Sequence, residues 1–165
     1  MPNQEIMREW VARLRSGDYR QGKGKLSYTT RRDGQREHCC LGVLSDIAVE
    51  HGVTASPVGI PEVISRRITN GEVVCEYATV YNYDDGNTTM PSQKVYEWSG
   101  IEIGCSISAG PDAPISANKL ANMNDRGATF AEIADYIEEQ WVDLPEGTEV
   151  PDSPATITAE ETVNA

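Results

Sequence analysis

The central apolar pattern of the chain lies between residues 38 and 52. Its apolar positions recur at helical spacing, at Cys40, Val43, Leu44, Ile47 and Ala48. This spacing places an apolar face along about three turns of helix. Gly42 has no side chain, so the backbone of another segment can approach the first turn closely. The pattern predicts a buried core helix over residues 39–51, ended by Gly52.

Two further segments have the same helical period. Residues 4–16 have one apolar face, made of Ile6, Met7, Trp10, Val11 and Leu14. Asn3 precedes them and can cap the helix. Residues 129–141 have another, made of Phe130, Ile133, Ala134, Ile137 and Trp141. Thr129 and Glu132 have the spacing of a capping box, so a helix is predicted to begin there.

Strands are predicted where the period shortens. Residues 26–32 and 35–39 read as two strands joined by a hairpin turn at Asp33-Gly34. Residues 73–83 are rich in β-forming side chains, and Asn70-Gly71 precedes them as another turn. One face of this strand is made of Val73, Cys75, Tyr77, Thr79, Tyr81 and Tyr83. Whether that face is half-buried or exposed stays open.

The remaining predictions concern shorter elements. Pro61 can open a short helix that extends through Arg67. Thr89 and Pro91 can cap and start a helix that bears Val95 and Trp98 and ends at Gly100. The alternating residues Ile101, Ile103, Cys105 and Ile107 indicate a short strand. Leu120 to Met123 read as a short helix, followed by a turn over residues 124–127.

These elements predict a single α+β domain over residues 1–142. It has a small antiparallel sheet packed against three main helices, at residues 4–16, 39–51 and 129–141. Residues 143–165 are rich in Pro, Glu, Thr and Ser and have no apolar period, so we expect an acidic tail that is disordered in isolation. No run of about 18 apolar residues occurs, so no membrane span is expected.

Charge is unevenly spread along the chain. Residues 1–38 hold nine Lys/Arg and five Asp/Glu, whereas residues 39–165 hold five Lys/Arg and 21 Asp/Glu. The first part is therefore basic, although the whole chain has a net charge of −12. No basic residue follows Arg126. An acidic surface repels duplex nucleic acid at long range, so duplex binding is not expected. The basic N-terminal part can still bind a small anion.

The loop that follows the first predicted helix offers a candidate ligand site. Its polar and aromatic residues are Arg15, Tyr19, Arg20, Gln21, Lys23 and Lys25, with glycines between them. Glycine-freed amides, cations and an aromatic ring are the components of a phosphate or nucleotide cradle, although the Walker A pattern is absent. Asn124 and Asp125 could bind a ribose or a cation. The alternatives are a solvated basic turn for the loop and a plain turn for Asn124-Asp125.

Cysteine chemistry gives a weaker candidate. His38-Cys39-Cys40 could place a nucleophile beside a base at a helix N-terminus. No nearby residue is seen to orient the base, so buried packing cysteines are favoured. A metal site made from His38, Cys39, Cys75 and Cys105 has no diagnostic spacing, so neither a metal nor a cofactor is expected.

Three blocks of the sequence resemble a family of small accessory proteins common in tailed-phage genomes. They cover residues 10–26, 39–44 and 123–134 in the family's order. The chain departs from the family pattern at Met123, where Leu is frequent, and in the longer region at residues 73–83. The resemblance implies an accessory protein in the cytoplasm of an infected bacterium. It implies no established activity and no catalytic residues.

No nucleophile–base–orienter set or paired-carboxylate motif stands out, so binding is favoured over catalysis. The first hypothesis is a counter-defence or host-takeover protein that sequesters a small phosphorylated ligand such as a nucleotide. The second is an acidic inhibitor that binds a host nucleic-acid enzyme by protein–protein contact, through residues such as Glu132, Glu138 and Glu139. The third is a cysteine-dependent enzyme. Self-association stays open.

Overall fold

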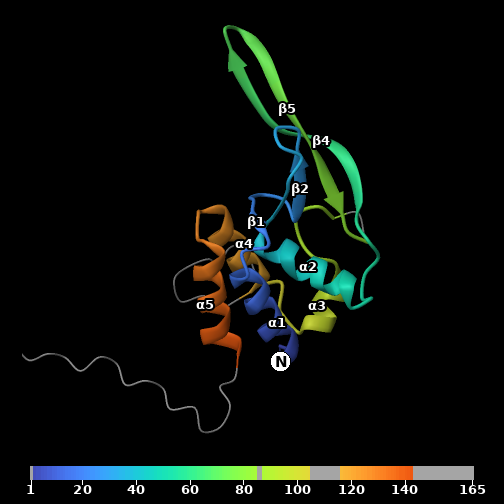
Figure 1. The fold of residues 1–165 in the computed structure, drawn as a ribbon, viewed down its shortest axis with the longest axis vertical. Helices are drawn as coiled ribbons and strands as arrows, with labels where there is room; N and C mark the ends of the chain where they lie inside the picture. The colour runs from blue at the N-terminus through green and yellow to red at the C-terminus, as the bar shows by residue number, and fades with distance from the viewer. Residues whose placement is uncertain (1, 85–86, 105–115, 143–165) are drawn as a thin grey trace, which may run out of the picture.

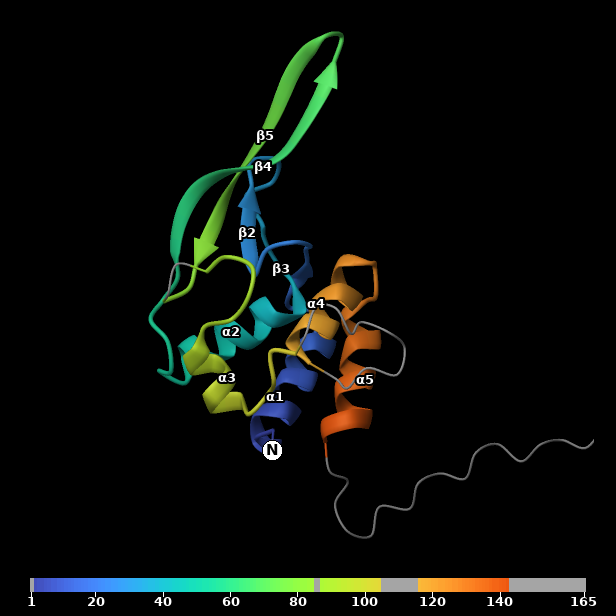
Figure 2. The ribbon, with the colours of Figure 1, turned by 180° about the vertical axis from the view of Figure 1, so that it is seen from behind.

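The computed structural model describes residues 2–84, 87–104 and 116–142, and within these ranges its helices gather at one end (Figure 1). The helices are α1 (Gln4–Arg15), α2 (Cys40–Glu50), α3 (Gln93–Ser99), α4 (Ala117–Asp125) and α5 (Phe130–Trp141). α1 and α5 lie side by side in both views of the ribbon (Figures 1 and 2). No helix in the described ranges is long and apolar enough to cross a membrane.

A mostly antiparallel sheet extends away from the helices. Its strands are β1 (Arg20–Gln21), β2 (Ser27–Thr30), β3 (Arg36–His38), β4 (Val58–Thr69) and β5 (Glu72–Asn82). The strand order is β1-β3-β2-β5-β4, and only β1 and β3 are parallel. The predicted mixture of helices with an antiparallel sheet is therefore confirmed at the level of an α+β fold.

Helix α2 lies in the core, as its apolar pattern predicts. Leu41, Val43, Leu44 and Ile47 are fully buried. The carbonyl of Cys40 accepts a hydrogen bond of 2.9 Å from the indole Nε1 of the buried Trp10 on α1. Gly52 adopts a φ of +71° just after the helix, a conformation that glycine tolerates best.

The caps expected for the other two main helices are present. The Asn3 Oδ1 accepts hydrogen bonds from the backbone N–H groups of Glu5 and Ile6, at 3.2 and 3.4 Å. Thr129 and Glu132 form both hydrogen bonds of the capping box. Gly100, with a φ of +74°, ends α3 as expected, but the N-cap of α3 is Ser92 rather than Thr89.

The predicted helix from Pro61 to Arg67 is wrong, because this segment belongs to β4. Strand β4 pairs with β5 from Val58 to Thr69 across the turn at Asn70-Gly71. Both turn residues have positive φ angles, 53° and 79°, as a type I′ hairpin turn requires. β4 is an edge strand, where a proline is tolerated because its missing N–H can face outward. The pairing with β5 therefore overrides the local helix signal.

Three smaller predictions also need comment. Strand β5 confirms the strand expected near residues 73–83. Residues 101–104 form no strand, and Cys105 and Ile107 lie outside the described residues, as does the predicted tail at 143–165. Helix α4 extends through Asn124 and Asp125, which therefore occupy its last turn instead of the predicted turn after a helix.

The close approach predicted at Gly42 exists, and it joins α2 to the start of β2. A Cβ at this position would lie 1.8 Å from the carbonyl oxygen of Leu26 and 2.6 Å from its carbonyl carbon. The same Leu26 oxygen accepts a hydrogen bond of 3.0 Å from the N–H of Cys39. Since these are backbone atoms, they cannot turn aside as a flexible side chain would.

We predict that Gly42→Ala lowers the free energy of unfolding by about 3 kcal/mol or more, because a methyl group must displace the Leu26 backbone. Urea denaturation followed by circular dichroism measures this. Gly17→Ala is the matched control. Gly17 has a positive φ, of 79°, which Gly42 does not have, but it has open space around it, so its replacement should cost only about 1 kcal/mol. Equal losses for the two variants would contradict the steric argument.

Candidate functional site

The loop between α1 and β2, predicted as a ligand cradle, is held by two side-chain amides. The Gln21 Nε2 donates to the Asn124 Oδ1 at 2.9 Å and to the carbonyl of Ala128 at 2.7 Å. The Gln21 Oε1 accepts from the N–H of Phe130 at 3.1 Å. Asn124 is fully buried, and its Nδ2 donates to the carbonyl of Gly22 at 2.8 Å. The two amides therefore connect the loop to α4 and α5.

Asp125 also contacts this loop. Its Oδ1 accepts a hydrogen bond of 3.0 Å from the N–H of Gly24. The structure thus brings Gln21, Asn124 and Asp125 together, which the sequence treated as separate candidates. Their described hydrogen bonds are made within the protein. A structural role explains them without a ligand.

Most of the candidate cations lie beside carboxylates. Arg15 pairs with Asp135 and Glu138 of α5, at 2.6 and 2.7 Å. Arg20 pairs with Asp33 and with Glu37, the latter at 3.4 Å. The Lys25 Nζ lies 2.7 Å from the Glu62 carboxylate. Within the described residues, Lys23 is the one of these four cations that has no carboxylate partner.

Tyr19, the aromatic residue of the loop, is turned inward. Its hydroxyl accepts a hydrogen bond of 3.2 Å from Arg13. Its ring meets the imidazole of His38 edge-on, with the ring centres 5.0 Å apart. The side chain therefore packs on the end of β3 as well as lining the loop.

A pocket of about 430 Å³ lies beside the loop. It is lined by Lys23, Gly24, Lys25, Tyr28, Glu62, Val63 and Ile64. Its size is within the range of small-molecule sites, and it combines a cation, an aromatic ring and apolar side chains. The Lys25–Glu62 ion pair places one negative charge in its wall, so Lys23 contributes the uncompensated positive charge.

A second polar cluster, centred on Asp46 of α2, was missed by sequence analysis. The Asp46 Oδ2 lies 2.7 Å from the His38 Nε2, and its Oδ1 accepts from Arg36 at 3.2 Å and from the Tyr83 hydroxyl. Arg36 also donates to the hydroxyls of Tyr83 at 2.6 Å and Ser27 at 2.9 Å. No sequence motif could indicate this cluster, because its residues come from four separate segments of the chain.

Charge compensation holds this cluster together. Burial raises the pKa of the Asp46 carboxyl, but hydrogen bonds from His38 and Tyr83 and the charge of Arg36 outweigh burial and lower the pKa overall. A carboxyl with a lowered pKa stabilises the folded state above its ordinary value of 3.8. This contribution is lost as the pH falls through the lower folded-state pKa.

The cysteines next to this cluster are buried, as expected for packing residues. Cys39 is 4% exposed, and its sulfur accepts a hydrogen bond of 3.4 Å from the N–H of Gly42. Burial raises the pKa of the Cys39 thiol to about 11 and that of the Cys40 thiol well above its ordinary value. Thiolates are therefore scarce at neutral pH, which does not support a cysteine nucleophile. Among the described residues, no three His, Cys, Asp or Glu side chains form a group that could hold a metal ion.

The hairpin of β4 and β5 has a different surface. It rises away from the helices in both ribbon views (Figures 1 and 2). Sequence analysis did not decide whether one face of β5 is half-buried or exposed. Exposure on this face varies along the strand: Tyr83, just beyond the strand, is 1% exposed, whereas Tyr77 is 45% and Val73 67% exposed. On β4, Ile68 is 77% exposed. The outer hairpin thus presents apolar side chains to solvent.

Comparison with known proteins identifies the family of this chain. A family model described as Domain of unknown function (DUF8296) matches residues 2–141. The chain belongs to this family. Neither the curated proteins nor the solved structures gave a match. The matched span runs from α1 to α5, so it includes the basic loop, the Asp46 cluster and the hairpin.

We predict that iodoacetamide at pH 7.5 alkylates Cys75, which is half-buried on the hairpin, about tenfold or more faster than Cys39 or Cys40. Burial and the scarcity of thiolate both slow the reaction of the α2 pair. Mass spectrometry of the digested protein measures each site, and urea-unfolded protein is the control in which this protection is lost. Alkylation of Cys39 as fast as that of Cys75 would revive the cysteine-enzyme hypothesis.

Proposed function

We propose that this protein acts by binding, and that the β4–β5 hairpin is the part that contacts a protein partner. The proposal rests on the distribution of exposed large hydrophobic side chains. Seven occur among the described residues, and all but Ile103 lie on the hairpin: Val58, Ile60, Ile68, Val73, Val74 and Tyr77. Ile68 and Val73 pair directly across the outer hairpin and form an exposed apolar patch, and such patches mark interaction sites.

The architecture of the hairpin supports this role. Two-stranded hairpins are marginally stable alone in water, and their open edges readily pair with other chains. A partner that covers the apolar side chains would remove both liabilities. The core provides the rigid base, because Ala78 and Val80 of β5 are buried.

The resemblance to tailed-phage accessory proteins gives the proposal its biological setting. It favours a host protein as partner, in the cytoplasm of an infected bacterium. The second sequence hypothesis placed the contact on acidic residues such as Glu132 and Glu138. Glu132 belongs to the capping box and Glu138 pairs with Arg15, so we move the contact to the hairpin.

The double variant Ile68→Lys, Val73→Lys tests this function. The two residues face each other across the hairpin, so two lysines replace a joint apolar patch. Both side chains are exposed, so the melting temperature should change little. We expect partner proteins captured from a phage-host lysate to fall about tenfold or more, as measured by quantitative mass spectrometry.

Ile103→Lys is the control for this experiment. Ile103 is 47% exposed but lies off the hairpin, so its replacement should leave the captured proteins unchanged. If the double variant captures the same proteins at the same level as the unmodified chain, the hairpin is not the contact. Sedimentation of the purified chain would identify a second copy as the partner if the double variant converts a dimer to a monomer.

Capture of a small phosphorylated ligand is the second candidate function. The pocket beside Lys23 favours it, since it joins an uncompensated ammonium group to the Tyr28 ring. Arg15, Arg20 and Lys25 contribute less charge than the sequence indicated, because each faces a carboxylate.

Lys23→Ala tests this second candidate. A charge-assisted hydrogen bond to phosphate contributes about 1.5–3 kcal/mol, so the substitution should weaken nucleotide binding about tenfold or more. Calorimetry with mono-, di- and cyclic nucleotides measures the affinity. Lys94→Ala is the control, because Lys94 pairs with Asp84 away from this pocket. Absence of heat and of thermal shift for every nucleotide would end this hypothesis.

A further inference from the structure

The edge of β5 is open beyond the end of β2. The last residue of β2, Thr30, pairs with Ala78 of β5. β5 continues outward from there to Glu72, paired only with β4 among the described residues. Because β2 ends at Thr30, the backbone edge of residues 72–77 is unpaired, within the described part of the chain, on the side of β5 where β2 lies. About six residues is the usual length of a strand.

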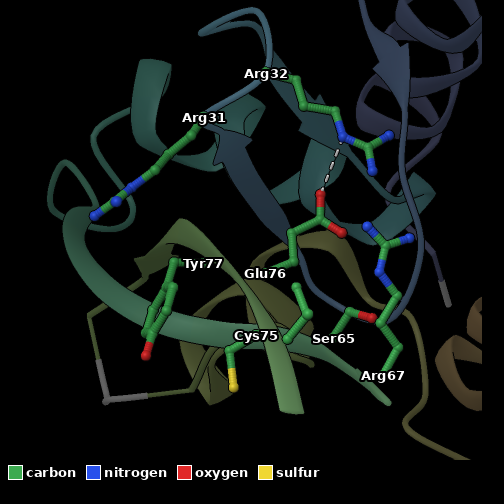
Figure 3. A pocket seen from close by; sticks show the side chains of 8 residues that line it. Arg31, Arg32, Ser65, Arg67, Cys75, Glu76 and Tyr77 are labelled. Carbon is green, nitrogen blue, oxygen red and sulfur yellow. Dashed lines mark ion pairs between the residues drawn. The ribbon is translucent and has the colours of Figure 1, made fainter. Parts of the chain in front are cut away.

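A pocket of about 280 Å³ lies where β2 stops. Arg31 and Arg32 border it from the turn after β2, and Arg67 borders it from β4. The β5 residues at the pocket include Cys75, Glu76 and Tyr77. Figure 3 shows Arg31 and Tyr77 on one side of the strand, and Arg32, Glu76 and Arg67 on the other.

The pocket is positively charged although the protein carries a net charge of −12. Glu76 is the one carboxylate in its lining, and it lies 3.4 Å from the Arg32 Nε. Arg31 lies over the Tyr77 ring, 5.7 Å from its centre. Within the described residues, neither Arg31 nor Arg67 has a carboxylate partner. Their guanidinium groups are free to meet carboxylates from outside.

We propose that residues 72–77 of β5 accept an extended, acidic segment of the partner protein as an added strand, in line with β2. This inference rests on the proposed binding role of the hairpin and names the chemistry of the partner. Backbone hydrogen bonds to the open edge hold the segment, and its acidic side chains meet Arg31 on one face and Arg32 and Arg67 on the other.

A strand fits these arginines better than a single small anion does. Figure 3 shows the guanidinium group of Arg31 turned away from those of Arg32 and Arg67, with β5 between them. One phosphate cannot reach both sides of the strand. Successive side chains of an extended peptide point to opposite faces, so one peptide reaches all three arginines.

The outer edge of β4 is a poorer acceptor. Its pairing with β5 is irregular between Val63 and Ser65, and Pro61 lies within the strand. Bulges and prolines on an edge strand block the addition of a further strand. Over the outer hairpin, where residues 65–69 pair with residues 72–76, the register is regular in both strands. The open edge of β5 is the one proposed to be extended, because Arg31 and Arg32 border the pocket on that side.

The test uses the full chain and two synthetic ten-residue peptides, one repeating Glu-Glu-Val-Val and one repeating Lys-Lys-Val-Val, so that each carries its charges on both faces when extended. NMR titration measures affinity, and amide hydrogen exchange reports new backbone hydrogen bonds. We expect the acidic peptide to bind, to weaken with added salt, and to slow exchange of amides within residues 72–77. The basic peptide should bind about tenfold or more weakly.

Two charge reversals sharpen the test. Arg67→Glu should weaken the acidic peptide about tenfold or more, because a repulsive pair replaces an attractive one. Arg66→Glu is the matched control. Arg66 is the neighbouring exposed arginine on the same strand but does not line the pocket, so its reversal should change the affinity less than about threefold.

Several outcomes would overturn the added strand. They are absence of binding, equal binding of the two peptides, binding that leaves exchange of residues 72–77 unchanged, and protection of β4 instead. Binding of inorganic phosphate lost in Arg67→Glu, without strand addition, would reassign the pocket to small anions. The hairpin role itself is judged separately: it fails if Ile68→Lys, Val73→Lys still captures the same partners, whatever the peptides do.

Discussion

The buried side-chain amide of Asn124 is the interaction on which the arrangement of the helices and the loop depends. Its Oδ1 accepts from the N–H of Cys40 at 3.2 Å, at the first turn of α2, while its Nδ2 holds the carbonyl of Gly22. One fully buried group thus joins α4, the core helix and the loop before β2. A buried amide without partners is costly, so these three segments are fixed together.

The sheet is joined to the same core by contacts that allow little variation. Leu26 has its carbonyl against Gly42, and Asp46 on the next turn of α2 binds His38 of β3 and Tyr83 just beyond β5. Helix α2 therefore positions β2, β3 and the end of β5 at once. These contacts hold the inner half of the sheet against the helix, whereas they do not reach the outer half of the hairpin.

Helical periodicity was enough to predict α1, α2 and α5, because α1 and α5 each bury one face and α2 is apolar and buried on nearly every side. It failed at Pro61, where the strand is set by pairing with β5, a contact that local sequence does not encode. The roles of Gln21 and Asn124 depend on residues about a hundred positions apart. Likewise, the Asp46 cluster forms only once four elements meet. The basic loop looked like a ligand site because its compensating carboxylates come from distant segments such as β4 and α5.

The separation between core and outer hairpin has a consequence for how this family can diversify. Residues 65–74 are all exposed, so changes among them leave the buried core untouched. Under the binding role proposed for the hairpin, contacts with the partner constrain these residues, whereas the helical core is constrained by the need to stay folded. On that proposal, the stretch around the Asn70-Gly71 turn can change its specificity on an unchanged scaffold, much as an antibody loop does on its framework.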